Sequence, residues 1–312
     1  MSLSLKFLGT SASRPTVERG VSALTVVREG ETMMFDCGEG TQRQMMRYGV
    51  SFTLGDIFFT HFHTDHFLGL LGLLRTLTLQ AREEPLRLWG PKGLVQMLKR
   101  ADGLGVERLT FPLEVAEVTP GEPIKRHEYA ILPFSVEHRG SSSVGYALIE
   151  EERRGIFNPD LARELGIPEG PLWGRIHKGE PIVLDDGRLI QPSTLVGPTR
   201  SGRRVVITGD TRPCAATIAA ATGADLLVHE ATFADEEAQR AGETGHSTAR
   251  EAAEVAASAG VKRLVLTHFS ARYSRDPSEL ETQARERFPA TSCARDGQEF
   301  EVPFTVTDSG QS

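Results

Sequence analysis

The sequence is poor in cysteine and has no long apolar run. Its 312 residues include three cysteines, Cys37, Cys214 and Cys293, whose odd number and wide spacing exclude a disulfide framework and a cysteine-based zinc finger. Such usage favours a reducing compartment. The longest apolar stretch, residues 67–74, is too short to span a bilayer, and residues 1–13 lack the charged start and apolar block of a signal peptide. We therefore expect a soluble, cytoplasmic protein without membrane contact.

Basic side chains are outnumbered by acidic ones. The chain has 35 Lys and Arg against 42 Asp and Glu, a net charge of -7 at pH 7. This balance argues against a general nucleic-acid coat protein, although a local basic patch fits within it. No repeat of fixed period is present. A chain of this length can form one large α/β domain or two small ones, and it buries enough apolar surface to fold without disulfides.

Short apolar runs alternate with segments of helical composition. Strands are predicted over residues 3–7, 23–27, 33–35, 57–60, 86–89, 129–136, 144–149, 205–208, 225–229 and 263–267. Helices are predicted over residues 41–48, 67–82, 92–101, 215–222, 247–259 and 278–288. This alternation favours a layered α/β fold in which helices flank the sheets.

Residues 150–198 break this alternation. Nine glycines and prolines fall between residues 155 and 181, which predicts an extended insertion without regular elements. A loop of that length inside a compact enzyme is either functional or a solvent-exposed connection with little local structure. The residues alone leave both interpretations open.

The densest group of ligand-type side chains follows the apolar run 57–59, at a strand-to-helix turn. Its members are His61, His63, Asp65 and His66. Imidazole nitrogen and carboxylate oxygen suit a borderline metal such as Zn²⁺, whereas hard cations prefer oxygen ligands alone. In an extended backbone His61 and His63 face the same way, and Asp65 and His66 beyond the turn can face a second ion. The alternative is a cluster of surface histidines.

Three further ligand candidates follow other predicted strands. They are His138, Asp210 and His268. Any one of them alone is more often a hydrogen-bonded residue than a ligand, but four strands that deliver candidates to the same type of position predict one site. Asp210 is the natural bridging ligand, because each of its two oxygens can bind one ion.

Eight short motifs run from one end of the chain to the other. They are Phe7-Leu8-Gly9-Thr10, Phe35-Asp36-Cys37-Gly38-Glu39-Gly40-Thr41, His61 to His66, Glu137-His138-Arg139, Thr208-Gly209-Asp210-Thr211, His229-Glu230-Ala231-Thr232, Gly245-His246-Ser247-Thr248 and Leu266-Thr267-His268-Phe269-Ser270. Together they resemble the ribonuclease Z family of the metallo-β-lactamase superfamily. This resemblance implies a four-layer αββα sandwich, a single domain over residues 1–312, with an inserted arm at residues 150–198.

The resemblance also implies roles for the site residues. It implies two zinc ions per subunit. His61, His63 and His138 would hold one ion, and Asp65, His66 and His268 the other, with Asp210 bridging the two. Manganese or iron fits the same ligands. Asp65 is implied to accept a proton from the attacking water, His246 to protonate the leaving oxygen, and Glu230 to orient or charge that imidazole. From the residues alone, His246 is a helix-start residue with a capping role and Glu230 a strand-end carboxylate in a salt bridge.

The implied activity is removal of 3′ trailers from tRNA precursors, with hydroxide attack at a two-metal site that leaves a 3′-hydroxyl on the tRNA. The implied partners are precursor tRNA and a second copy of the chain, since family members are commonly homodimers. The residues alone predict only metal-assisted hydrolysis. The alternatives are a small-molecule hydrolase of the same fold, acting on a lactone, thioester, sulfate ester or cyclic phosphodiester, and a catalytically silent zinc-binding protein.

In the arm, the residues implied to bind tRNA are Gly170, Pro171, Arg175 and Lys178. Residues 150–180 hold five Lys and Arg against seven Asp and Glu, a net charge of -2, whereas a phosphate clamp normally carries positive charge. Basic residues near the expected mouth of the site could compensate: Arg14, Arg19, Arg43, Arg47 and Arg139.

Four other reactive side chains are assigned no role in the site. His127 and His177 lie in polar surroundings, and a buried hydrogen bond suffices for His229. Cys37 is predicted to be a small core residue, because the acidic neighbours Asp36 and Glu39 oppose a lowered thiol pKa.

Overall fold

The computed structural model describes residues 2–101, 108–140 and 142–304. The chain forms two compact units, one built from Met1–Ile149 and Arg203–Ser312 and the other from Glu150–Gly202. Among the described residues, no helix combines the length and the apolar character needed to cross a membrane.

The first unit contains two seven-stranded sheets. Across the first sheet the order is β16 (Glu299–Glu301), β1 (Leu3–Gly9), β2 (Ala23–Arg28), β3 (Glu31–Phe35), β4 (Asp56–Phe58), β5 (Leu86–Gly90) and β6 (Leu113–Glu117). Across the second it is β15 (Thr291–Cys293), β14 (Leu264–Thr267), β13 (Leu226–Glu230), β12 (Arg204–Ile207), β9 (Val144–Glu150), β8 (Tyr129–Ser135) and β7 (Ile124–Lys125). Strands β3 to β6 are parallel, as are β12 to β15.

Side chains that alternate along each strand explain why the two sheets stack. In β12, Val205 and Ile207 enter the apolar layer shared by both sheets, while Val206 packs in the layer on the other face. The shared layer also holds an aromatic cluster in which the Phe58 ring lies 5.1 Å from Phe35 and 5.4 Å from Tyr146. Strands that are apolar on both faces are therefore buried between two layers.

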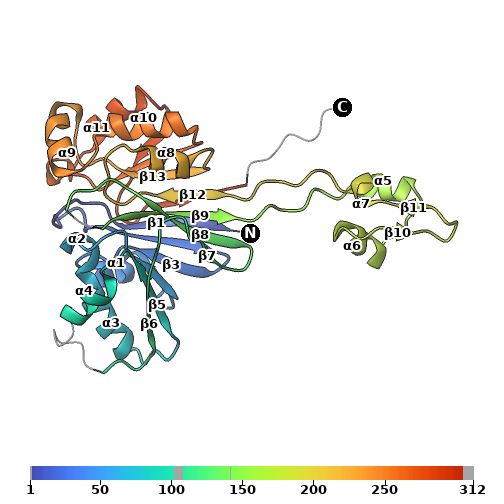
Figure 1. Ribbon diagram of the computed structural model, residues 1–312, viewed down its shortest axis with the longest axis horizontal. Coiled ribbons are helices and arrows are strands. Elements are labelled where there is room, and N and C mark those ends of the chain that lie inside the picture. The colour runs from blue at the N-terminus through green and yellow to red at the C-terminus, as the bar shows by residue number, and fades with distance from the viewer. Residues whose placement is uncertain (1, 102–107, 141, 305–312) are drawn as a thin grey trace. The chain divides into compact units, whose positions relative to one another are not determined.

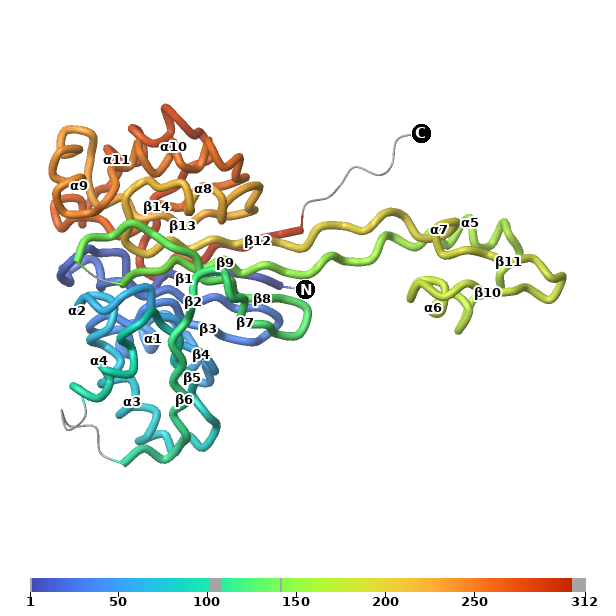
Figure 2. The backbone as a smooth tube through the Cα atoms, viewed as in Figure 1, coloured from blue at the N-terminus to red at the C-terminus, as the bar shows by residue number. Residues whose placement is uncertain are grey.

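Helices cover the outer face of each sheet (Figure 1). The first sheet is covered by α1 (Thr41–Tyr48), α3 (Gly69–Leu79) and α4 (Leu94–Ala101), and the second by α8 (Ala215–Ala221), α10 (Ala249–Ala259) and α11 (Ser278–Arg285). In Figure 2 the blue-to-green segments build β1 to β6 with their helices, and the yellow, orange and red segments build the outer helical layer of the second sheet. The remaining strand of the first sheet, β16, comes from the C-terminal part of the chain. This arrangement confirms the predicted αββα layers.

Shorter helices lie in the loops near the ends of the strands. They are α2 (Thr64–Phe67), α9 (Ala238–Thr244), and the 3₁₀ turns η1 (Asp235–Glu237) and η2 (Ala271–Tyr273). The helix predicted over residues 67–82 is α3, which spans Gly69–Leu79; Phe67 is instead the last residue of α2, which was not predicted.

The second unit corrects the prediction that residues 150–198 lack regular elements. It contains α5 (Pro159–Glu164), α6 (Pro171–His177), α7 (Pro192–Leu195) and a hairpin of β10 (Ile182–Val183) and β11 (Leu189–Ile190). Each helix begins with a proline, which suits the first helical position because that residue needs no backbone N–H donor. Gly166 and Gly179, with φ of +76° and +93°, follow α5 and α6. The residues interpreted as breakers therefore mark the ends of short helices.

Apolar residues of these short elements form a core of their own. Its buried members are Ala162, Ile167, Ile176, Ile182, Ile190 and Leu195. The second unit is therefore a small folded body, and its bounds, residues 150–202, extend four residues beyond the predicted insertion.

Candidate metal centre

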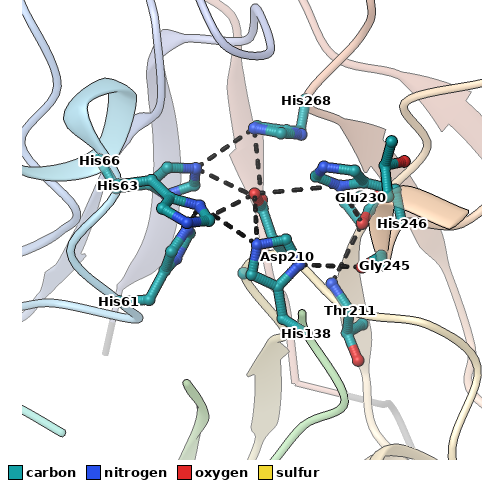
Figure 3. Close-up of polar contacts among 12 residues, drawn as sticks. His61, His63, His66, His138, Asp210, Thr211, Glu230, Gly245, His246 and His268 are labelled. Carbon is teal, nitrogen blue, oxygen red and sulfur yellow. Dashed lines mark hydrogen bonds and ion pairs between the residues drawn. The ribbon is translucent and has the colours of Figure 1, made fainter. Parts of the chain in front are cut away.

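All seven predicted ligands gather where β4, β8, β12 and β14 end. Figure 3 labels all of them except Asp65. They form two groups, and within each group the ligand atoms lie no more than 4.8 Å apart. The first group is His61, His63, His138 and Asp210; the second is Asp65, His66 and His268. Asp210 and His268 also form such a group with His246. Residues distant in sequence thus converge because the fold aligns the ends of their strands.

The Asp210 carboxylate lies between the two groups. Its Oδ1 is 3.3 Å from Nε2 of His66 and 3.3 Å from Nε2 of His268. Its Oδ2 faces the other group, 3.6 Å from Nε2 of His61 and 3.9 Å from Nε2 of His138. Each oxygen therefore serves one group, as a bridging carboxylate requires.

The donor set fits divalent metal ions. Imidazole nitrogens face each other closely, at 3.0 Å between His61 Nε2 and His63 Nδ1 and 3.2 Å between His66 Nε2 and His268 Nε2. Asp210 Oδ1 is buried and has no hydrogen-bond partner, an arrangement that is rare unless an ion satisfies the atom. Nitrogen with carboxylate oxygen is the donor chemistry of Zn²⁺ and related ions.

The second ring nitrogen of most ligand histidines is held by a neighbour. Nδ1 of His66 lies 2.7 Å from Asp36 Oδ2, and Nδ1 of His138 lies 2.9 Å from the Gly245 carbonyl oxygen. Nδ1 of His268 lies 3.0 Å from the Thr232 hydroxyl. Partners of this kind fix the ring and leave Nε2 directed at a metal.

Buried charges set the protonation of the cluster. Burial lowers the pKa of His66, but the carboxylates of Asp210 and Asp36 outweigh it and hold that pKa well above its usual value. Burial also lowers the pKa of His61, and the neighbouring charge of His66 lowers it further. The cluster therefore places a ring with a raised pKa, His66, and a ring with a lowered pKa, His61, beside the same Asp210 carboxylate.

Asp36 is a functional residue that sequence reasoning missed, although it lies in one of the eight motifs. Its carboxylate accepts hydrogen bonds from the Thr60 backbone N–H at 2.8 Å and from the Thr60 hydroxyl at 2.9 Å, besides its contact with His66. Its φ of +57° is unusual for a residue with a side chain, as are those of Ser13 and His268 at the same site. Its position directly after a predicted strand, like that of Asp210, was the available signal.

We expect Asp36→Asn to weaken metal binding by about 10- to 100-fold, because the His66 ring loses its charged partner. Competition with a chromophoric chelator measures the change. The matched control is Asp225→Asn, which removes another largely buried carboxylate, bonded to Lys262 at 2.6 Å, and should leave metal affinity unchanged. Equal affinities for Asp36→Asn and the wild type would exclude this role.

Asp65 faces the cluster from α2. Its Oδ2 accepts a hydrogen bond from the Ser13 backbone N–H at 2.7 Å and lies 3.4 Å from Nε2 of His268. Burial raises the pKa of Asp65, but the hydrogen bond with His268 and the charge of His66 outweigh it and hold the pKa below its usual value. A Cβ at Gly38 would lie 2.2 Å from the Asp65 carbonyl oxygen, so only glycine permits this approach.

His246 and Glu230 form a hydrogen-bonded pair beside the cluster. Nδ1 of His246 donates to Glu230 Oε1 at 2.8 Å, and Glu230 also accepts from the backbone N–H groups of Thr211 and Thr232 at 3.0 and 3.1 Å. Burial lowers the pKa of His246, but the Glu230 charge and hydrogen bond raise it to about 9. The structure thus brings together the two residues that the sequence only paired by resemblance.

The predicted tRNA-binding residues lie on α6 of the second unit. Gly170 precedes the helix with φ of +138°, and Pro171 begins it. Arg175 pairs with Glu180 at 3.0 Å, and Lys178 ends the helix.

Arg19 corrects a prediction, because it is buried and does not line the mouth. Its guanidinium donates to the Ser274 carbonyl oxygen at 2.7 Å and to the Thr10 hydroxyl at 2.6 Å. Arg14, Arg43, Arg47 and Arg139 are exposed.

The other histidines and Cys37 lie outside the metal groups. His229 is buried, with Nδ1 2.7 Å from the Glu230 carbonyl oxygen, and His177 contacts the Gly155 carbonyl oxygen in the second unit. The side chain of His127 is exposed. Burial raises the pKa of the Cys37 thiol to about 12, which leaves it an inert core residue.

Known proteins resemble the chain over nearly its whole length. The family model described as Anti-Pycsar protein Apyc1 matches residues 3–164, and the model described as Beta-lactamase superfamily domain matches residues 191–269. A protein named Ribonuclease Z from Gemmatimonas aurantiaca is 67% identical over 306 residues, 98% of each chain. Another of that name, from Myxococcus xanthus, is 53% identical and covers 97% of this chain and 98% of its own. The crystal structure of human tRNase Z, short form, has a TM-score of 0.69 at 29% identity and covers 96% of this chain and 100% of that one.

Proposed function

The chain belongs to the ribonuclease Z family, and we propose that it removes 3′ trailers from tRNA precursors as a metal-dependent endoribonuclease. The reaction hydrolyses the phosphodiester after the discriminator nucleotide, leaving a 3′-hydroxyl on the tRNA and a 5′-phosphate on the trailer. The observation that carries the proposal is the two ligand groups joined by Asp210, with the His246–Glu230 pair beside them.

The proposed metal is zinc, two ions per subunit, and Mn²⁺ or Fe²⁺ fits the same donors. His61, His63 and His138 would hold one ion, Asp65, His66 and His268 the second, and Asp210 both. When bound, such ions lower the pKa of a coordinated water and offset charge that builds on the phosphodiester. The chain's own contribution is a rigid set of donors, since neighbours outside the cluster hold the rings.

Two side chains move protons in the proposed reaction. Asp65 is placed to accept the proton of the attacking water, because the Ser13 N–H holds its carboxylate at the cluster. His246 gives a proton to the leaving 3′-oxygen of the tRNA, since its Nδ1–H is tied to Glu230 and Nε2–H stays available. Glu230 orients that ring and stabilises its charged form.

The arm, the dimer and the location of the protein stay predictions. In the arm, Arg175 is tied to Glu180, whereas Lys178 has no carboxylate within 4.0 Å among the described residues; Gly170 and Pro171 supply backbone at the start of α6. A homodimer is supported by exposed apolar side chains on the α1 to α3 surface, Met46 and Leu79 being 62% and 71% exposed. A cytoplasmic location rests on cysteine usage.

The test is incubation of the purified protein with a precursor tRNA that carries a 3′ trailer, with both product ends mapped. Cleavage after the discriminator, with a 3′-hydroxyl on the tRNA and a 5′-phosphate on the trailer, is the expected result. A protein that leaves the precursor intact but hydrolyses bis-p-nitrophenyl phosphate would instead be a small-molecule hydrolase of the same fold.

A further inference from the structure

A small pocket opens between the loop after β1 and helix α1. Its volume is about 100 Å³, and its walls are Pro15 to Gly20 on one side and Glu39, Gly40, Arg43, Gln44 and Arg47 on the other. We call it the α1 pocket. This volume exceeds that needed for a single water molecule several-fold, so the pocket has room for a phosphate group.

The α1 pocket lies next to Asp65. The Ser13 N–H bonds the Asp65 carboxylate at 2.7 Å, and Pro15 in the pocket wall comes two residues later, at most about 7 Å along the chain. The opposite wall begins directly after Gly38, whose backbone packs against Asp65. Both walls therefore continue from segments that touch the metal site on its Asp65 side.

A buried polar network fixes the base of the pocket. The Asp296 carboxylate accepts hydrogen bonds from the Gly20 N–H at 2.6 Å, the Thr10 hydroxyl at 2.7 Å and the Gln44 side-chain amide at 2.8 Å. Arg19 is buried against the Phe269 ring at 4.9 Å and anchors the same loop. The walls are thus held in place before any ligand arrives.

The exposed cations of the pocket have no carboxylate partner. Arg43 and Arg47 lie one turn apart on α1, and among the described residues no carboxylate lies within 4.0 Å of either guanidinium. Three acids lie around the pocket: Glu18, which is paired with Arg275 at 3.2 Å, Glu39 in the wall, and Asp296 at the base, where it accepts the hydrogen bonds described above.

Three arginines of the arm differ, because local acids pair with them. Arg163 pairs with Asp160 and Glu169, Arg175 with Glu180, and Arg188 with Asp186, at 2.6 to 3.0 Å. The guanidinium groups of α1, by contrast, keep their donors for a ligand such as phosphate.

We propose that the α1 pocket binds a phosphate of the single-stranded 3′ trailer, with Arg43 and Arg47 as its ligands. The inference rests on the proposed function. Because the leaving 3′-oxygen belongs to the tRNA and faces His246, the tRNA end lies on that side of the metal site. The strand beyond the cut then continues on the Asp65 side, where the pocket opens. Contacts to backbone phosphate position an RNA strand without reading its sequence, so the pocket would accept trailers of any sequence.

The test compares two precursor tRNAs with the variant Arg43→Ala/Arg47→Ala. One precursor carries a trailer of about ten nucleotides, and the other a single nucleotide, whose only trailer phosphate is the scissile one. We expect kcat/KM to fall on the order of tenfold on the long trailer and less than about twofold on the short one. The slope of log kcat/KM against log salt concentration should flatten by about 0.7 on the long trailer alone, the value for one lost phosphate contact on single-stranded RNA.

The matched control is Arg285→Ala/Arg287→Ala, which removes the same charge from α11 and the residues after it. It should leave both substrates unchanged. Equal losses on long and short trailers, or no loss on either, would overturn the inference while cleavage by the wild type upholds the proposed function. A wild type that cleaves neither substrate contradicts the proposed function, and the pocket is then judged by fluorescence anisotropy with the trailer as a free 5′-phosphorylated oligonucleotide: equal binding by wild type and variant overturns it.

Discussion

Asp210→Ala is expected to lose both metal ions at once and to abolish cleavage. One carboxylate oxygen faces His66 and His268 at 3.3 Å, and the other faces His61 at 3.6 Å, so Asp210 supplies a donor to both groups. Loss of the metal's share of transition-state stabilisation, several kcal/mol, corresponds to a fall of at least about 10³-fold in kcat/KM. Elemental analysis of the purified variant measures the metal, and precursor tRNA cleavage measures the activity.

Asp210→Asn separates the bridging role from a general loss of folding. The amide keeps one carbonyl oxygen as a donor, so we expect the metal content to fall to about one ion per subunit, with circular dichroism unchanged. His127→Ala is the matched control, because it removes an exposed histidine outside the cluster. An Asp210→Ala protein that still binds two ions would rule out a bridging carboxylate.

The inner strands of both sheets could be predicted from the sequence, and the outer ones could not. Buried strands such as β12 and β13 are apolar on both faces, so their residues form continuous runs. In the two seven-stranded sheets, the four strands without a predicted counterpart, β6, β7, β15 and β16, are the outermost. An edge strand pairs on one side only, and its residues are partly exposed, which removes the apolar signal.

The convergence of the candidate ligands could be predicted because a strand end carries a strong pattern, an apolar run followed by a polar residue. Asp36 shares that pattern, but a carboxylate that orients a ligand has no signature of its own in the sequence. Its role appears only in the 2.7 Å contact with His66, which lies 30 residues away in the chain. Ser13 was equally hidden, since it contributes a backbone N–H to Asp65 and any residue carries that group.

The secondary structure of the arm was mispredicted because proline and glycine have opposite effects on a helix, depending on where they stand in it. Inside a helix they disrupt it, whereas proline at the first position and glycine after the last one are favourable. With helices of four to seven residues, such as α7 and α6, the ends make up most of the element. Their composition therefore looks like that of a loop, and only the buried core around Ile176 and Leu195 distinguishes the two.

His246→Ala is expected to lower kcat on precursor tRNA by about 10² to 10⁴-fold while both metal ions stay bound. The leaving 3′-oxygen of the tRNA is a poor leaving group unless it gains a proton, and the His246–Glu230 pair at 2.8 Å is the donor beside the cluster. Glu230→Gln should give a smaller fall, because the ring keeps a hydrogen bond but loses the charge that favours its protonated form. Single-turnover cleavage with elemental analysis checks both variants.

The choice of substrate makes this prediction specific to proton donation. The p-nitrophenolate released from bis-p-nitrophenyl phosphate is a stable anion and leaves without a proton, so His246→Ala should hydrolyse it at close to the wild-type rate. Asp210→Ala should lose both activities, since the metal serves either substrate. A His246→Ala protein that fails equally on both substrates, with its metal intact, would show that His246 shapes the site rather than protonating the leaving oxygen.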